Sequence, residues 1–290
     1  MPYTKSPLRY PGGKSQLSKF IQHTIKFNDI KNVTYCEAFC GGSGVAMALL
    51  FNQTITHAIL NDLDPAIFSI WNAILTETDR FTNAIQNIPI TLNEWHHQKN
   101  IYIDLKNISG YSFDLALAAF FLNRTNRSGI IEGGPIGGYK QDSKYKLNCR
   151  FNVQNLINKI NKIASYRNQI TLYNMDGIQF IQNIITPMPD NNLFIFFDPP
   201  YYNQGENLYK NSLDDTYHQN LSYSIQQLNH KYWIVTYDDV TRIRNLYDFT
   251  NGQKYDIRYS ANAKRKETEL LFCSPITQVE SFDKVIFSNV

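Results

Sequence analysis

Residues 192–203 read NLFIFFDPPYYN, an apolar run followed by an aspartate and two prolines. The run Leu193–Phe197 predicts a strand buried on both faces, because an apolar stretch without alternation is typical of a covered parallel strand. The two prolines lack a backbone donor and fix φ near about −65°, so the strand ends there. This predicts a stiff corner that places Asp198, Pro199 and Tyr201 at the carboxyl end of a strand, where open α/β sheets bind ligands. An ordinary turn after a buried strand is the alternative.

The composition favours a large globular chain. With 290 residues and 43% hydrophobic content, one large domain or a main domain with a smaller insertion is expected. No apolar stretch approaches the length of a membrane span, and the start, MPYTKSPLRYPGGK, lacks the apolar core of a secretory signal. We therefore expect a cytoplasmic protein that does not enter a membrane, and a monomer or weak dimer.

The sequence gives little indication of a metal site. Its cysteines show no C-x-x-C spacing, which disfavours a zinc site or a disulfide framework. His96 and His97 are adjacent and would point to different sides of a helix or strand, so they are poor co-ligands. We expect reduced thiols and no metal.

A glycine-rich turn follows the first expected strand. Residues 33–39 predict this strand, Cys40–Gly44 the turn, and residues 45–51 an apolar helix, which together form the first half of a nucleotide-binding βαβ unit. A second strand ends at Asp62, eighteen residues after Gly44, where an acid can accept hydrogen bonds from a ribose. Met47 replaces the third glycine of a dinucleotide fingerprint and disfavours a pyrophosphate. An adenosyl ligand such as S-adenosylmethionine fits this turn better.

The βα rhythm lapses between about residues 76 and 167 and then resumes. Seven strands are expected, the last two forming an antiparallel pair. The predicted fold is an α/β sheet in two halves, residues 1–75 and 168–290, with the mainly helical segment 76–167 inserted between them. Residues 121–168 hold nine basic and two acidic side chains, a charge of +7 in a chain of net charge +3. A local basic field is typical of a surface that meets phosphates, although a solvated charged face is the alternative.

A polar loop of this insertion is a candidate for DNA recognition. Arginine reads guanine edges and asparagine reads adenine edges in a DNA groove. The candidates in this loop are Arg124, Asn126, Arg127 and Lys140. A surface loop without this role remains the alternative.

Four motifs together resemble a known family. RYPGGK near the start, FCGGSG after the first strand, Asn61-Asp62 after the second and DPPY at 198–201 are similar to the Dam-like N6-adenine DNA methyltransferases of alpha-type motif order. The resemblance covers nearly the whole chain. It implies the seven-stranded, Rossmann-like sheet of S-adenosylmethionine-dependent methyltransferases with its last strand antiparallel, and an inserted target-recognition domain. It also implies double-stranded DNA as substrate, and a cognate restriction endonuclease stays open as a partner.

The resemblance also implies roles for single residues. Asp198, Pro199 and Tyr201 would form the catalytic pocket, with Asp198 also beside the cofactor. Asp62 would hold the ribose and Asp176 the adenine of the cofactor. The remaining cofactor contacts implied are Tyr10, Lys14, Phe39, Gly41 and Gly44.

The chemistry of adenine methylation calls for such a corner. The exocyclic amine is a poor nucleophile because its lone pair is delocalised into the ring. Asp198 and the Pro199 carbonyl can each accept one amine hydrogen and favour a pyramidal nitrogen, while Tyr201 offers a ring on which a flipped-out base can stack.

Other readings remain open at this stage. An RNA adenine methyltransferase shares the DPPY chemistry, and a non-catalytic nucleic-acid-binding protein on the same fold would retain the sheet. A protein-glutamine methyltransferase would carry Asn in place of Asp198, and a nicotinamide oxidoreductase is disfavoured by Met47.

Overall fold

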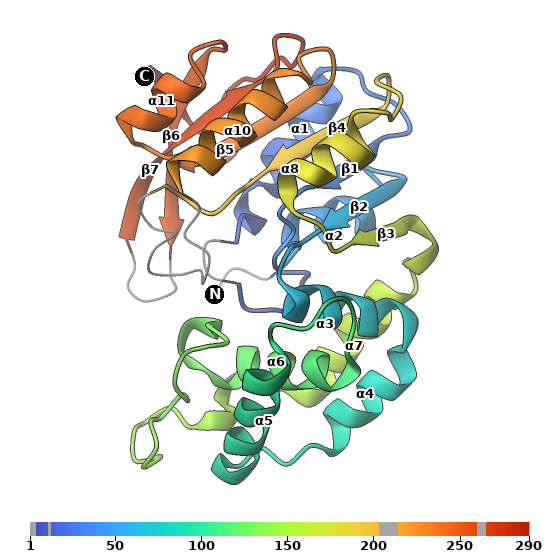
Figure 1. Ribbon diagram of the computed structural model, residues 1–290, viewed down its shortest axis with the longest axis vertical. Coiled ribbons are helices and arrows are strands. Elements are labelled where there is room, and N and C mark those ends of the chain that lie inside the picture. The colour runs from blue at the N-terminus through green and yellow to red at the C-terminus, as the bar shows by residue number, and fades with distance from the viewer. Residues whose placement is uncertain (1–3, 11–12, 203–213, 260–264, 290) are drawn as a thin grey trace.

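The computed structural model describes residues 4–10, 13–202, 214–259 and 265–289. Pro11 and Gly12 of the RYPGGK motif therefore lie outside the described residues, as does the segment 203–213 that follows the DPPY corner. The chain is an α/β fold built on one mixed sheet, with helices on both of its faces (Figure 1).

The sheet has the strand order β3-β2-β1-β4-β5-β7-β6-β8. The first five strands in this order are parallel, and β7 runs antiparallel to both β5 and β6. Their bounds are β1 Thr34–Glu37, β2 His57–Asn61, β3 Ile170–Tyr173, β4 Leu193–Phe197, β5 Tyr232–Asp238, β6 Gly252–Tyr259, β7 Arg265–Cys273 and β8 Phe287–Asn289.

The predicted sheet differs from the observed one by one strand. All seven expected strands are present, and the reversed direction of β7 agrees with the expected antiparallel pair. The eighth strand, β8, adds to the outer edge by pairing antiparallel with β6. The count of seven was therefore one too low, because β8 is only three residues long and carries no apolar alternation that would predict it.

Helices account for most of the rest of the described chain. Their bounds are η1 Ser15–Leu17, α1 Ser18–Phe27, α2 Gly44–Phe51, α3 Pro65–Thr76, α4 Thr78–Asn87, α5 Leu92–Leu105, α6 Phe113–Thr125, η2 Arg127–Gly129, η3 Leu147–Arg150, α7 Val153–Ala164, η4 Arg167–Gln169, α8 Gly177–Phe180, η5 (a π-helix) Ile181–Ile185, α10 Asp215–Gln226 and α11 Thr241–Leu246.

Two hydrophobic cores lie on opposite faces of the sheet. Along β4, Leu193, Ile195 and Phe197 belong to the core beneath α8, α10 and α11, whereas Phe194 and Phe196 belong to the core shared with α1, α2 and α3. All five β4 side chains are buried. The apolar run thus folds as predicted, since a strand covered on both faces has no polar side to alternate with.

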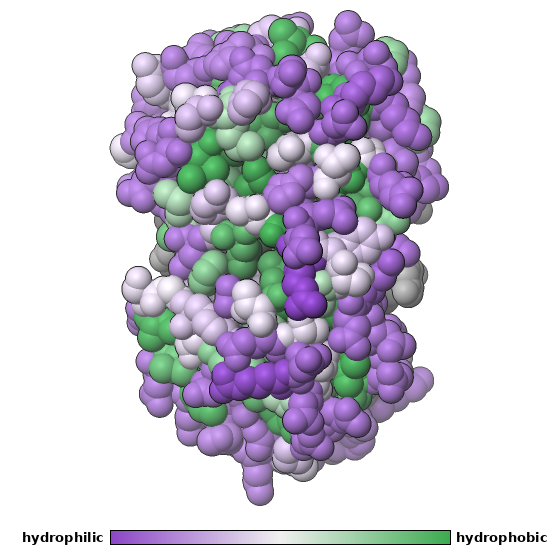
Figure 2. All heavy atoms as spheres, turned by 90° about the vertical axis from the view of Figure 1, so that its right-hand side faces the viewer, coloured by the Kyte–Doolittle hydropathy of each residue, from purple (hydrophilic) through white to green (hydrophobic). Residues whose placement is uncertain are grey.

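The segment between the two halves of the sheet forms a helical layer at one end of the molecule. Helices α4, α6 and α7 pack against α3, and α5 packs against α6 (Figure 1). Their apolar side chains join the core of α1 and α2. Figure 2 shows that hydrophilic residues cover most of one side of the molecule, with hydrophobic residues visible between them. Within the described ranges, no helix combines the length and apolarity needed to cross a bilayer.

The central position of β4 predicts the cost of weakening it. Ile195 is 0% exposed, so Ile195→Ala should lower the free energy of unfolding by about 2–5 kcal/mol through the lost burial and the cavity left behind. Leu63→Ala is the control, because Leu63 is 48% exposed and should cost within about 0.5 kcal/mol. Urea denaturation monitored by circular dichroism measures both. Equal losses in the two variants would contradict the central role of β4.

Candidate active site

Three polar side chains lie on one face of the sheet where β4 and β5 end. They are Asp198, Thr236 and Glu269. Side chains alternate along a strand, so residues two positions apart face the same side. The residue two positions before Asp198, the one before Thr236 and the one after Glu269 all belong to the core of α1 and α2, so the three polar groups share that face. The Thr236 hydroxyl donates to Asp198 Oδ1 over 2.9 Å. The alternation therefore brings groups from β5, β7 and the end of β4 to the same place.

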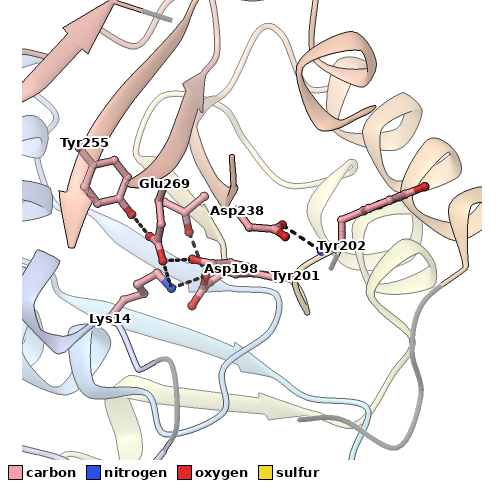
Figure 3. A network of polar contacts seen from close by, with 8 residues as sticks. Lys14, Asp198, Tyr201, Tyr202, Asp238, Tyr255 and Glu269 are labelled. Carbon is pink, nitrogen blue, oxygen red and sulfur yellow. Dashed lines mark hydrogen bonds and ion pairs between the residues drawn. The ribbon is translucent and has the colours of Figure 1, made fainter. Parts of the chain in front are cut away.

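Lys14 lies between the carboxylates of Asp198 and Glu269 (Figure 3). Its Nζ is 3.1 Å from Asp198 Oδ1 and 3.5 Å from Glu269 Oε1. It also lies 4.6 Å from the centroid of the Tyr201 ring, whose hydroxyl donates to Glu269 Oε1. The side chains of Lys14 and Glu269 are 3% and 1% exposed, whereas that of Asp198 is 21% exposed. Asp198 is thus the member of this cluster that a ligand reaches most easily.

The environment of Asp198 shifts its ionisation. Burial raises the pKa of this carboxyl above its usual range; the Lys14 ammonium opposes the shift, and the nearby Glu269 carboxylate adds to it. A raised pKa makes Asp198 a better hydrogen-bond and proton acceptor than an exposed aspartate.

The glycine turn between β1 and α2 is supported by a buried glutamate. Glu37 accepts hydrogen bonds from the Ser43 hydroxyl at 2.6 Å, the Ala46 amide at 3.0 Å and the Tyr35 hydroxyl at 3.2 Å. Burial raises the pKa of Glu37 to about 7, although these bonds oppose the shift. Ser43 has φ 46° and Gly41 φ 44°, both in the left-handed region, so the turn requires such external support.

The N-terminal segment docks onto this turn. A Cβ on Gly41 would come within 2.6 Å of the Tyr10 ring, and a Cβ on Gly44 within 2.1 Å of the Ser15 hydroxyl oxygen. The missing side chains therefore make room for this segment, which carries Tyr10 and Lys14. The role of both glycines beside a cofactor stays a prediction, next to this packing role.

The next strand end carries Asp62. Its Oδ2 accepts from the Gly41 amide at 2.8 Å and its Oδ1 from the Asp64 amide at 3.0 Å. Burial, with a smaller contribution from the Asp64 carboxylate, raises the pKa of Asp62 to about 7. The preceding Asn61 is buried and bonds to the backbone of Ala38 and Met175. The ends of β1, β2 and β3 are thereby held together.

Asp176 and Phe39 lie beside these strand ends. The Asp176 carboxylate caps α8 by accepting from the Ile178 amide at 2.9 Å, and its second oxygen accepts from the Tyr217 hydroxyl at 2.8 Å. The Phe39 ring packs so closely on Gly177 that a Cβ there would lie 2.5 Å from it. The residues expected around a cofactor thus gather along one edge of the sheet.

Of the four expected recognition residues, Asn126 is buried and Arg124 is half-buried, and both are held by hydrogen bonds to the chain. The Arg124 guanidinium donates to the carbonyls of Pro7 and Arg150, and its burial lowers its pKa to about 9. Asn126 is 0% exposed; its amide donates to the carbonyls of Ile130 and Ile131, and its oxygen accepts from Trp95 at 2.6 Å. The expectation that Asn126 reads a base edge is therefore wrong for this structure, because its side chain is enclosed, whereas the recognition role of Arg124 stays a prediction.

The other two residues that were expected to take part in recognition are at the surface. Arg127 and Lys140 are exposed and line a cavity of about 480 Å³ together with the rings of Tyr139 and Tyr145, which are 62% and 59% exposed. The cavity thus combines cations with accessible aromatic rings, although Asp142 also lines it.

Sequence reasoning missed Glu37, Thr236 and Glu269. Glu37 is the single acid of its short strand, a position where acids are rare unless paired, and this was the available signal. Glu269 gave no such signal, because the first half of β7 is charged and polar and also holds Glu267. Thr236 gave no such signal, because threonine is common in strands.

The described part of the chain was also compared with the patterns of metal ligands and disulfides. No group of three or more His, Cys, Asp or Glu that could hold a metal ion occurs there. The four cysteines are free, and Cys149 is exposed whereas the other three are buried.

The sheet order, the glycine turn at β1 and the DPPY corner at β4 define the methyltransferase class of α/β folds. A model of the family described as D12 class N6 adenine-specific DNA methyltransferase matches residues 10–263, and the chain belongs to this family.

Two solved structures that resemble this chain are distant from it in sequence. The rRNA methyltransferase aviRa from Streptomyces viridochromogenes is 11% identical, with 92% of this chain and 88% of that chain covered and a TM-score of 0.41. A candidate RNA methyltransferase from Pyrococcus horikoshii is 9% identical, with 92% and 83% covered and a TM-score of 0.42. Likeness at this level carries no argument about function. No curated protein matched the sequence.

The buried Glu37 predicts a pH-dependent stability difference. Its folded-state pKa lies above the ordinary value of 4.5, so wild-type stability is lost as pH rises from about 4.5 to about 7, where the folded protein must bury the charge. Glu37→Gln removes this loss. Its unfolding free energy relative to wild type should therefore rise by on the order of 3 kcal/mol between about pH 5 and pH 8, measured by urea denaturation. Asp248→Asn, at an exposed position after α11, is the control. A pH-independent difference for Glu37→Gln would contradict the assignment.

Proposed function

We propose that this protein transfers a methyl group from S-adenosylmethionine to the N6 amine of adenine in DNA. Membership of the D12 family supports adenine methylation. The observation that carries the proposal is the partly exposed Asp198 carboxylate at the end of β4, held by Lys14 and Thr236 next to the glycine turn of β1.

The residues along the sheet edge fit S-adenosylmethionine. Asp62 and Asp176 follow β2 and β3 and offer carboxylate acceptors, which suit the hydroxyls of a ribose and the amine of an adenine. They would repel a pyrophosphate. Phe39 contributes an apolar ring beside Gly177. Tyr10 and Lys14, which lie between the glycine turn and Asp198, would flank the methionine portion.

The chain's own groups would prepare the target amine. When bound, S-adenosylmethionine supplies an electrophilic methyl group and keeps the bonding pair on sulfur as a neutral thioether. Asp198 and the Pro199 carbonyl accept the two N6 hydrogens, so that the nitrogen lone pair is freed from the ring and directed outward. The nitrogen gives up one proton once it has gained the methyl group, and Asp198, whose pKa is raised, is the acceptor already bonded to it.

The Tyr201 ring provides a surface for the target base. Chemistry on N6 at this buried edge requires the adenine to leave the duplex and enter the site. The ring is fixed by its hydroxyl bond to Glu269, so its plane is set before the base arrives. A stacked base on a pre-fixed ring loses less conformational freedom on binding.

We assign target recognition to residues 76–167. Arg127 and Lys140 are the exposed cations of the insertion loop that we propose to contact DNA, with Tyr139 and Tyr145 beside them in the cavity. Arg124 and Asn126 contribute by holding the loop in shape. A basic surface next to the methyl-transfer edge would track phosphates in either nucleic acid, and only the assay below separates DNA from RNA.

Asp198→Ala should reduce methyl transfer by about 100- to 1,000-fold or more, because it removes an acceptor that acts on the amine in the transition state. The measurement uses S-adenosylmethionine with a labelled methyl group, mixed-sequence DNA and RNA in separate reactions, and digestion to nucleosides. Wild type should label N6-methyldeoxyadenosine.

The control for this experiment is Asp248→Ala, which removes an exposed aspartate after α11 and should leave activity unchanged. Circular dichroism verifies that both variants are folded. Label found only in RNA would replace the DNA assignment. Retained activity in folded Asp198→Ala would refute the catalytic role.

Replacing Arg127 and Lys140 together by alanine should weaken DNA binding and flatten its salt dependence. Each lost phosphate contact reduces the slope of log K against log salt by about 1. Fluorescence anisotropy with a labelled duplex at several salt concentrations measures this. The matched control is Lys31→Ala, an exposed cation before β1 at the opposite end of the parallel strands. An unchanged slope in the double variant would remove these residues from the interface.

A further inference from the structure

Glu269 is a buried carboxylate in the sheet, and the family resemblance gives it no role. It lies on β7, next to β5 and β6, with its side chain 1% exposed. It faces the same side of the sheet as Asp198, since the residue two positions further along β7 belongs to the core of α1 and α2. A buried acid costs stability unless it is paired and hydrogen-bonded, so its partners indicate its purpose.

Both oxygens of Glu269 are used, and each by a different element (Figure 3). Oε1 accepts from the hydroxyl of Tyr201, in the DPPY corner, and lies 3.5 Å from Lys14 Nζ. Oε2 accepts from the hydroxyl of Tyr255 on β6, the residue directly opposite Glu269 in the strand register. Tyr255 is 1% exposed, so its packed ring holds the Glu269 carboxylate in place through this hydrogen bond. Glu269 thus connects the rigid sheet to two groups at the proposed reaction site.

Lys14 creates a conflict that Glu269 can resolve. Its ammonium bonds to Asp198 Oδ1, and the same oxygen accepts from Thr236. Oδ1 thus already has two donors, and a target amine that bonds to the same oxygen competes with the ammonium. A buried ammonium without a counter-ion is costly, and Lys14 can leave Asp198 only if another carboxylate is close. Glu269 lies within reach on the other side.

We propose that Glu269 is a positioning residue of the methyl-transfer site, which fixes the Tyr201 ring through its hydroxyl and receives the Lys14 ammonium when the target amine bonds to Asp198. This inference rests on the proposed function. Glu269 touches neither substrate in this account; it acts through Tyr201 and Lys14.

The charge of Glu269 also acts on Asp198. It raises the pKa of the Asp198 carboxyl, whereas Lys14 lowers it. Removing the Glu269 charge should therefore let Asp198 ionise at lower pH. A glutamate that only braced the strands would change stability without moving the pH dependence of the reaction.

The test is Glu269→Gln, which keeps the shape of the side chain and an oxygen that can accept from tyrosine hydroxyls. We expect kcat for adenine methylation to fall about 10- to 100-fold, in the range seen when groups that position a reaction are disturbed. The acid limb of the kcat–pH profile should move to lower pH. Glu280→Gln removes an exposed carboxylate that pairs with His23 and is the matched control, with unchanged kcat and profile.

Two tyrosine variants make the test independent of the folding of Glu269→Gln. Tyr201→Phe should lower kcat, and combining it with Glu269→Gln should cost less than the two separate losses multiplied, because both disturb the contact between Tyr201 and Glu269. If Glu269→Gln does not fold, Tyr255→Phe tests the role of Glu269 instead. This variant removes one hydrogen bond to the Glu269 carboxylate without removing its charge. We expect kcat to fall about threefold to tenfold, with an unchanged KM for the cofactor.

The outcomes separate this inference from the proposed function. An active wild type with unchanged kcat and pH profile in folded Glu269→Gln, or with unchanged kcat in Tyr255→Phe when Glu269→Gln does not fold, overturns the role of Glu269 alone. A fully multiplicative double variant removes its link to Tyr201. A wild type that methylates adenine in neither DNA nor RNA overturns the proposed function and this inference together.

Discussion

The ion pair between Lys14 and Asp198 is the interaction on which the site depends. The apolar strand β4 carries Asp198 to the boundary of the interior, where an unpaired carboxylate would be strongly disfavoured. Lys14 compensates for this charge, and it can do so only because the N-terminal segment docks on the glycine turn through Tyr10. The turn itself is held by the buried Glu37. The Asp198 charge therefore depends on Lys14 near the start of the chain, and the position of Lys14 depends on the turn after β1.

The same arrangement connects the fold to the proposed chemistry. Strand alternation gathers Asp198, Thr236 and Glu269 on one face, and the opposite face is closed by an apolar core. Thr236 and Glu269 are buried, whereas Asp198 is partly exposed at the end of β4, where the ends of β1, β2 and β3 also lie. A site open on one side can bring a cofactor along these strand ends and a base toward Asp198, in the orientation that a displacement reaction requires.

The sequence predicted what local patterns encode. The buried strand before DPPY, the glycine turn and the acid at Asp62 depend on neighbours within a few residues, and all are found at one sheet edge. Long-range partners were not predictable: Glu269 meets Tyr201 across 68 positions, and no periodicity reports such a pairing. The same limit applies to Asn126. Its polar neighbours in the sequence resembled a surface loop, but its side-chain oxygen accepts a buried hydrogen bond from Trp95, thirty-one residues earlier. Strand β8 was missed because three residues carry no pattern.

The most direct measurement is a crystal structure of the protein with S-adenosylhomocysteine and a DNA duplex that contains the target adenine. The account predicts a flipped-out adenine on the Tyr201 ring, its N6 within hydrogen-bonding distance of Asp198, and the Lys14 ammonium moved from Asp198 to Glu269. An adenine bound at Asp198 with the ion pair to Lys14 still intact would contradict the exchange of partners. A base bound away from this sheet edge would contradict the site itself.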